Sequence, residues 1–323
     1  MSAPATTPVI VVTDQSFGGT PHAAAIAVRN GAALRSHQVR AEAETVAAVR
    51  GADVVLVQYA PVTAAVLDAI NPGGCVIRYG IGYDNIDVTA AHARGIRVAT
   101  VPDYGVDTVA DHAVALIYAA GRRIVQYDRL LRASRGAVGP DAAGVFDEFA
   151  ATTVGLVGTG RIGRAIAHRL AASGVRLIAY DPYADPAVTP AELLPLDDVL
   201  AAVDILSLHA PATAETHHLI RAETLARMKP DAVLVNTARG SLVDTEALAD
   251  ALVDGRLGGA ALDVVDPEPL PPDSRLWDAP NLLMTPHVAF YSRQSLERLE
   301  RLAAEEAERA LRSEPLRSEI TAP

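Results

Sequence analysis

The sequence is poor in several residue types, and each shortage excludes a class of protein. Its 323 residues include a single cysteine, Cys75, which excludes an internal disulfide and a cysteine-based metal cluster. Aromatic residues make up only 4% of the chain, so Ala and Val must fill most of the core. Lys229 is the only lysine, and 28 basic residues face 39 acidic ones. With no block of Lys and Arg and a net charge of -11, a general nucleic-acid binder is excluded.

Long apolar runs are also missing. No run approaches the roughly 18 residues of a membrane span, and the first residues, MSAPATTP, lack the basic and apolar regions of a signal peptide. We therefore expect a soluble, cytoplasmic protein with no membrane partner. The length exceeds one ordinary domain and fits two of about 150 residues each.

Short β-branched runs alternate with Ala-rich helical stretches from Val9 onward, a pattern that predicts an α/β fold with parallel sheets. One such series ends near Val101, and a second begins at Thr153. Between them, Asp107-Thr108 is a predicted N-cap for one long helix that runs to about Tyr127.

The most informative segment is VGLVGTGRIG, residues 154–163. Gly158, Gly160 and Gly163 form a G-x-G-x-x-G pattern between a predicted strand and a predicted helix. In that context the glycines allow a tight turn, backbone approach to a pyrophosphate and close packing of helix on strand. Asp181 ends the next predicted strand, where a carboxylate accepts hydrogen bonds from ribose hydroxyls and repels a 2′-phosphate. The sequence therefore predicts NAD rather than NADP as the cofactor.

Three later residues form a candidate catalytic set. Arg239 follows a predicted strand in VNTARG, and its guanidinium suits a carboxylate and a polarised carbonyl. His287 lies in TPH before the last helix and is the candidate proton donor. Glu268, in DPEP, is the candidate carboxylate partner of His287. The set predicts hydride chemistry on a 2-oxo or 2-hydroxy acid.

The ordered motifs GTGRIG, Asp181, SLHAP, NTARG, DPEP and TPH resemble the D-isomer-specific 2-hydroxyacid dehydrogenase family. RYGIGYDNID (78–87) and HVAFYS (287–292) are most similar to bacterial members related to the C-terminal-binding proteins. The resemblance implies an NAD-dependent oxidoreductase in which Arg239 binds the substrate, His287 is the general acid/base and Glu268 tunes His287. It also implies a homodimer.

The family resemblance further implies a fold and two sets of contacts. The fold has two doubly wound parallel-sheet domains: a Rossmann NAD domain, residues 104–285, is inserted into a flavodoxin-like substrate domain, residues 1–103 and 286–323. The implied cofactor contacts beyond the glycines and Asp181 are Thr108, Arg161, Ile162, His209, Ala210, Pro211, Thr237, Ala238 and Asp263. Ile81 and Gly82 are implied to hold the substrate carboxylate, and Arg78 beside them is a candidate substrate contact or an internal ion-pair residue.

Some alternatives stay open. The substrate side chain is not specified, and 3-phosphoglycerate oxidation would require several cations where the substrate domain has few beyond Arg78. An NAD-sensing, corepressor-like interaction module is the alternative from a different class. His217-His218 superficially suggests a metal pair, but adjacent residues on a regular element face different ways, so we expect no metal site.

Overall fold

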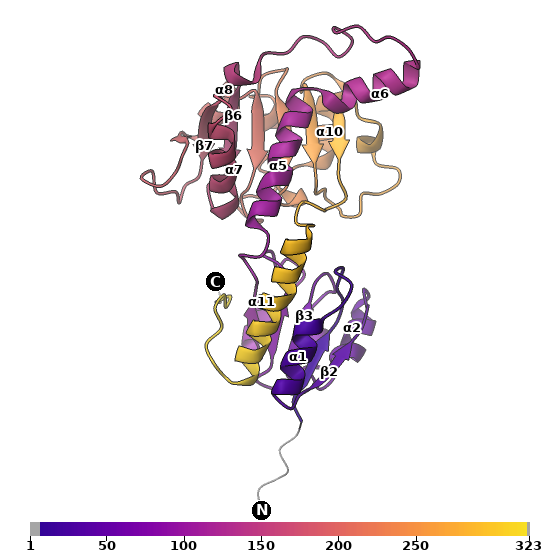
Figure 1. Ribbon diagram of the computed structural model, residues 1–323, viewed down its shortest axis with the longest axis vertical. Coiled ribbons are helices and arrows are strands. Elements are labelled where there is room, and N and C mark those ends of the chain that lie inside the picture. The colour runs from indigo at the N-terminus through magenta and orange to yellow at the C-terminus, as the bar shows by residue number, and fades with distance from the viewer. Residues whose placement is uncertain (1–6, 322–323) are drawn as a thin grey trace, which may run out of the picture. The chain divides into compact units, whose positions relative to one another are not determined.

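The computed structural model describes residues 7–321, and the chain divides into two compact units (Figure 1). The first unit comprises the chain up to Gly105 together with the segment from Tyr291 onward, and the second comprises Val106–Phe290. The predicted boundaries at 103/104 and 285/286 lie within a few residues of this division. Residues 287–289 belong to the second unit because the backbone N–H groups of Val288 and Ala289 donate to the Asp263 carboxylate.

The first unit contains a parallel five-stranded sheet in the order β2-β1-β3-β4-β5, which is the flavodoxin-like order. Its strands are β1 (Val9–Val12), β2 (Ala33–Ser36), β3 (Val54–Val57), β4 (Cys75–Arg78) and β5 (Arg97–Ala99). Its helices are α1 (Pro21–Arg29), α2 (Glu42–Val49), α3 (Ala64–Leu67), α4 (Val88–Ala93) and α11 (Arg293–Leu311). Strand β3 is buried along its whole length, which explains its continuous apolar sequence.

The long helix α11 returns the chain to the first unit and packs beside α1 (Figure 1). Ser292 caps it by accepting a hydrogen bond from Ser295 N, and Leu299, Ala303 and Ala307 form its buried stripe. The buried Glu300 carboxylate accepts the N–H groups of His22 and Ala23 in the first turn of α1. This contact joins the N-terminal helix α1 to the C-terminal helix α11 within the first unit.

The second unit contains a parallel seven-stranded sheet in the order β12-β11-β10-β9-β6-β7-β8. When the strands are numbered from β6, their order is the Rossmann order 3-2-1-4-5-6, and β12 is a seventh strand beside the sixth. The strands are β6 (Thr153–Val157), β7 (Arg176–Tyr180), β8 (Glu192–Leu193), β9 (Ile205–Leu208), β10 (Val233–Asn236), β11 (Gly259–Leu262) and β12 (Leu282–Met284). The α-helices are α5 (Val106–Gly121), α6 (Ile124–Ser134), α7 (Arg161–Ala171), α8 (Leu196–Ala202), α9 (Ala222–Leu225) and α10 (Thr245–Val253).

Both faces of this sheet are covered, and β10 shows why. Val233 and Val235 enter one apolar core, with helices α5 and α7, while Leu234 enters the other, with α8 and α10. Successive side chains of a strand point to opposite faces, so a strand buried on both faces reads as an unbroken apolar run. The predicted α/β fold with two doubly wound sheets is confirmed.

The single helix predicted to start at an Asp107-Thr108 cap and run to Tyr127 is wrong in two respects. Helix α5 begins at Val106, so both residues lie in its first turn. The chain then breaks at Arg123, whose φ is 52°, before α6 begins at Ile124. The apolar pattern continues across the break, so periodicity alone could not reveal it. Among residues 7–321, no helix is long and apolar enough to cross a membrane.

Candidate active site

The glycine loop lies between β6 and α7, and its geometry matches the role of each glycine. Gly158 has φ +94°, which favours glycine. A Cβ on Gly163 would lie 2.2 Å from Gly158 O, so only glycine permits this close approach of helix and loop. A Cβ on Gly160 would meet no atom within 4 Å, so the backbone there is open to a ligand. Arg161 and Ile162 form the first turn of α7, where backbone N–H groups attract phosphate.

Asp181 follows β7 and is held in place by its own neighbours. Its Oδ2 accepts hydrogen bonds from Thr159 N at 2.7 Å and Thr159 Oγ1 at 2.9 Å, and its Oδ1 accepts one from Tyr183 N. Partial burial opposes its ionisation, but these hydrogen bonds outweigh it and lower the pKa of Asp181. The carboxylate is therefore fixed and charged beside the glycine loop, as a ribose acceptor should be.

His209, Ala210 and Pro211 follow β9, beside the glycine loop. A Cβ on Gly158 would lie 2.8 Å from both His209 O and Ala210 N. The His209 ring is buried against Ser207, with Nε2 and Oγ 2.8 Å apart. Burial lowers the pKa of His209 to about 3, so this imidazole is neutral. A contact of this neutral ring with the cofactor stays a prediction.

The NTARG segment forms a tight turn after β10. Asn236 builds this turn: its Nδ2 donates to Arg239 O, and its Oδ1 accepts from Ala238 N. The Arg239 Nη1 donates to Ala238 O, which fixes the guanidinium near the strand end. The Thr237 hydroxyl is buried with no hydrogen-bond partner among residues 7–321. A buried orphan hydroxyl at the edge of the sheet that also carries the glycine loop fits a bound dinucleotide.

Glu268 and His287 meet at the same edge, after β11 and β12. His287 Nδ1 and Glu268 Oε1 are 2.7 Å apart. His287 therefore donates its Nδ1–H to the Glu268 carboxylate, which fixes the tautomer and the orientation of the ring. Arg239, Glu268 and His287 thus lie at the carboxyl ends of three neighbouring strands, where ligands bind in such sheets.

Asp263 holds the turn that carries His287. Its buried Oδ1 accepts from Thr285 Oγ1 at 2.6 Å and from Val288 N at 2.9 Å, and its Oδ2 accepts from Ala289 N. These bonds stabilise His287 at φ 55°, in the left-handed region. Asp263 was predicted as a nicotinamide contact; the structure adds this anchoring role, which no sequence motif reveals.

Two further residues were not identified from the sequence. Gly240 is needed because a Cβ there would lie 2.0 Å from Val265 O, so the loops after β10 and β11 touch backbone to backbone. The second residue is His112, on α5. Its Nε2 is 3.1 Å from Thr285 Oγ1 and 3.7 Å from Asp263 Oδ1, so it belongs to the Asp263 network. Thr108, a predicted cofactor contact, lies on the same helix.

The predicted substrate residues lie in the first unit, where Arg78 ends β4 and Ile81 and Gly82 follow it. The Arg78 Nη1 donates to Tyr79 O, and a Cβ on Gly80 would lie 1.6 Å from that nitrogen. The guanidinium therefore folds over its own turn. Ile81 is 37% exposed, and Gly82 follows it. A substrate role for Arg78, Ile81 and Gly82 stays a prediction.

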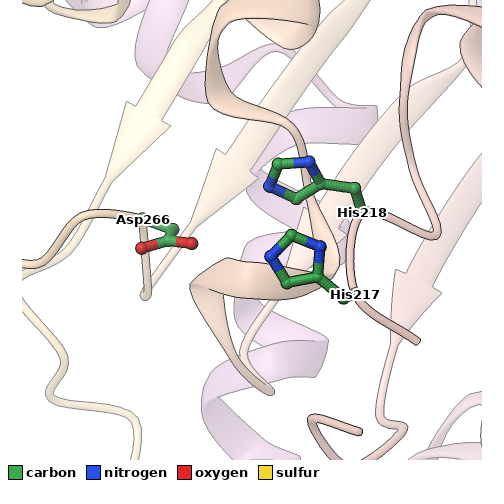
Figure 2. Close-up of side chains that lie close together, drawn as sticks. All are labelled: His217, His218 and Asp266. Carbon is green, nitrogen blue, oxygen red and sulfur yellow. The ribbon is translucent and has the colours of Figure 1, made fainter. Parts of the chain in front are cut away.

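The expectation that His217 and His218 face apart is wrong. Their rings stack with centroids 4.0 Å apart, and Asp266 lies close to both (Figure 2). His218 has φ 48°, which breaks the alternation that a regular strand or helix would impose. The sequence gives no signal for this conformation because His218 is not a glycine.

Comparisons with known proteins agree with this geometry. Residues 114–289 match the family model described as D-isomer specific 2-hydroxyacid dehydrogenase, NAD binding domain. The chain is 43% identical over 83% of its length to a D-3-phosphoglycerate dehydrogenase of Mycobacterium leprae, but spans only 51% of that protein. It is 41% identical over 76% of its length to a glyoxylate reductase of Korarchaeum cryptofilum, covering 75% of that chain. A solved D-lactate dehydrogenase from Aquifex aeolicus, complexed with NAD and lactic acid, superposes with a TM-score of 0.85 at 26% identity, covering 94% of this chain and 96% of that one.

Proposed function

The chain belongs to the D-isomer-specific 2-hydroxyacid dehydrogenase family, and we propose that it interconverts a small 2-oxo acid and its D-2-hydroxy acid with NAD as cofactor. The observation that carries this proposal is the 2.7 Å hydrogen bond between His287 Nδ1 and Glu268 Oε1. This pair lies at the same edge of the sheet as the glycine loop. A proton donor and a dinucleotide site on one edge are what reduction of a ketone requires.

The residues that hold the cofactor are those of the glycine loop, Asp181 and Thr237. The Gly160 backbone and the first turn of α7 receive the pyrophosphate, Asp181 the ribose hydroxyls, and the orphan Thr237 hydroxyl gains a partner. Bound NAD(H) supplies or accepts the hydride. The other predicted cofactor contacts, among them Thr108, His209 and Asp263, are part of the same proposal.

The proton and the charge are handled by the chain itself. Arg239 binds the substrate carboxylate and polarises the carbonyl oxygen. In the reductive direction, His287 gives the proton on Nε2 to that oxygen and regains one from solvent after product leaves. Glu268 accepts the hydrogen bond from Nδ1 throughout, so the imidazole keeps one orientation. In the oxidative direction the same Nε2 accepts the hydroxyl proton.

The charges of the first unit favour a small uncharged side chain over a phosphorylated one. At the carboxyl edge of its sheet, Arg40 pairs with the buried Asp14 at 3.3 Å and lies over the Tyr59 ring, 4.7 Å from its centroid. Arg78 is engaged by Tyr79 O. Both cations already have partners, so a substrate phosphate would have to displace them. We therefore favour a glyoxylate-like acid, although a relative is a D-3-phosphoglycerate dehydrogenase.

The test is NADH oxidation by the purified protein with a panel of 2-oxo acids, from glyoxylate and pyruvate through branched and aromatic acids to phosphohydroxypyruvate. We expect turnover with a small acid to exceed turnover with phosphohydroxypyruvate. The opposite preference would make the phosphoglycerate reaction the function. If the protein binds NADH but oxidises it with none of these acids, the result would contradict the proposed activity and favour an NAD-sensing interaction module.

A homodimer in the cytoplasm is part of the same proposal. Helix α6 has no buried residue, and its apolar side chains Ile124, Leu130 and Leu131 are exposed in the single chain. Such a face supports pairing with a second copy. Analytical ultracentrifugation should show a dimer that Leu131→Glu weakens, whereas a monomeric wild-type protein would contradict the assignment.

A further inference from the structure

Two loops of the second unit bring together three side chains that can bind a metal, none of which belongs to the catalytic set. His217 and His218 lie in the loop after β9, and Asp266 lies in the loop after β11. One ring nitrogen of each histidine and one carboxylate oxygen lie within 4.8 Å of one another. Figure 2 shows both rings with a nitrogen turned toward Asp266.

The histidine loop is fixed by its backbone. His218 N donates to Ser241 O at 2.8 Å, and Ile220 N donates to Leu242 O at 2.9 Å. These bonds stabilise the unusual φ of 48° at His218, which stacks the two rings at an interplanar angle of 23°. A non-glycine residue in the left-handed region costs free energy and is often found where function requires it.

The Asp266 loop is fixed as firmly. Thr245 Oγ1 donates to Asp266 O at 2.5 Å, and the preceding Val265 O packs directly on the Gly240 backbone. The three donors are therefore presented by loops that are already anchored, so binding a ligand would require little ordering of the chain.

A second carboxylate lies near the His218 ring. Asp244 Oδ2 is 4.0 Å from His218 Nδ1, too far for a hydrogen bond, and Asp244 Oδ1 accepts one from Ala247 N at 3.1 Å. At this distance the carboxylate adds negative charge beside the imidazole, which favours a bound cation. The neighbouring cation, Arg221, is paired with Glu223 at 2.9 Å. The site thus combines two imidazoles and a carboxylate with a net negative surrounding.

We propose that His217, His218 and Asp266 bind one divalent ion of the zinc class, with water completing the coordination. Two imidazoles and one carboxylate are zinc ligands, whereas Mg²⁺ and Ca²⁺ prefer shells of oxygen. Bonds of about 2.0–2.1 Å place the donors of a tetrahedral site about 3.3 Å apart. In the structure the three donor atoms lie within 4.8 Å of one another, and rotation of the exposed His217 side chain would bring them to the shorter spacing.

Isothermal titration of the EDTA-treated, tag-free protein with zinc chloride tests the site. We expect one ion per chain in the wild type. His217→Ala, His218→Ala and Asp266→Asn should each weaken binding by about 100-fold or more, since losing even an outer-shell partner costs about 10–100-fold. His168→Ala, which removes an exposed histidine of α7, and His287→Ala, which removes the catalytic candidate, should bind zinc as the wild type does.

A wild type without a saturable site would overturn the proposal, as would zinc binding that survives both histidine substitutions or is lost in His287→Ala. Thermal unfolding gives a second readout, because an ion that binds only the folded state raises the midpoint. Zn²⁺ should raise it in the wild type and His168→Ala but not in His217→Ala, and Mg²⁺ should leave it unchanged. A zinc-dependent rise in His217→Ala equal to the wild type would contradict the site. Neither readout depends on turnover.

Discussion

Two halves of one sheet edge use the same residue type in opposite ways. The cofactor half consists of the loops after β6, β7 and β9 together with Thr237 after β10, and the chemistry half of Arg239, Glu268 and His287 after β10, β11 and β12. One histidine from each half shows the contrast. His209, in the cofactor half, is buried against Ser207, and burial lowers its pKa to about 3. His287, in the chemistry half, is partly exposed and paired with the Glu268 carboxylate at 2.7 Å.

Position along the edge does not make a histidine a proton donor; its surroundings do. A buried imidazole without a carboxylate stays neutral and serves packing. An imidazole oriented by a carboxylate and reached by solvent can exchange a proton. Changes in the chemistry half should therefore alter turnover and spare NADH binding, and changes in the cofactor half should do the reverse.

The largest of these effects is expected for Glu268→Gln. Glutamine keeps the size of the side chain but removes the charge that orients His287, so turnover should fall by about 100-fold or more. The NADH dissociation constant, from fluorescence titration, should stay within about twofold of the wild-type value. A loss of NADH affinity as large as the loss of turnover would show that the two halves do not have separate roles.

Gly160→Ala should act on the cofactor half alone. The position has φ −61° and no atom within 4 Å of an added Cβ, so alanine fits the free protein without strain. The methyl group would block approach of the pyrophosphate and weaken NADH binding by about tenfold or more. Circular dichroism should show an unchanged unfolding midpoint, and Gly136→Ala, an exposed control, should change neither quantity. Unaltered NADH affinity in Gly160→Ala would show that the pyrophosphate does not bind at this loop.

Thr237→Val tests the orphan hydroxyl. Because the hydroxyl has no hydrogen-bond partner within residues 7–321, its removal should not lower the unfolding midpoint. It should weaken NADH binding by about fivefold, corresponding to about 1 kcal/mol for one hydrogen bond. Thr237→Ser should restore the affinity. A destabilised Thr237→Val with normal NADH binding would show that the hydroxyl serves the fold.

The smallest effect concerns stability and pH. The pKa of His209 is about 3 when folded and about 6.5 when unfolded, so below pH 6.5 the unfolded chain binds a proton that the native chain does not. Stability from this group is present above pH 6.5 and is lost as pH falls toward 3, by about 1 kcal/mol per pH unit. Urea unfolding at pH 7 and pH 5.5 should show a smaller loss for His209→Asn than for the wild type. Equal losses would mean that His209 titrates normally.

The sequence predicted much of this edge because its signals are local. The glycine spacing, Asp181, Arg239, Glu268 and His287 each follow a strand, and parallel strands bring their carboxyl ends together. What it could not predict depends on backbone conformation or on distant contacts. The break at Arg123 interrupts an apolar pattern that continues, and the left-handed His218 turns two adjacent rings to one side. The anchoring role of Asp263 joins β11 to residues 288–289, which no spacing rule connects.

The central claim is that His287 is the proton donor, and His287→Ala tests it most directly. The variant should be assayed for NADH binding by fluorescence and for turnover with the best 2-oxo acid of the panel. We expect wild-type NADH affinity with turnover reduced by about 10²–10⁴-fold, the usual contribution of a positioned acid or base. Undiminished turnover in a variant that binds NADH normally would contradict the account and place the proton donor elsewhere.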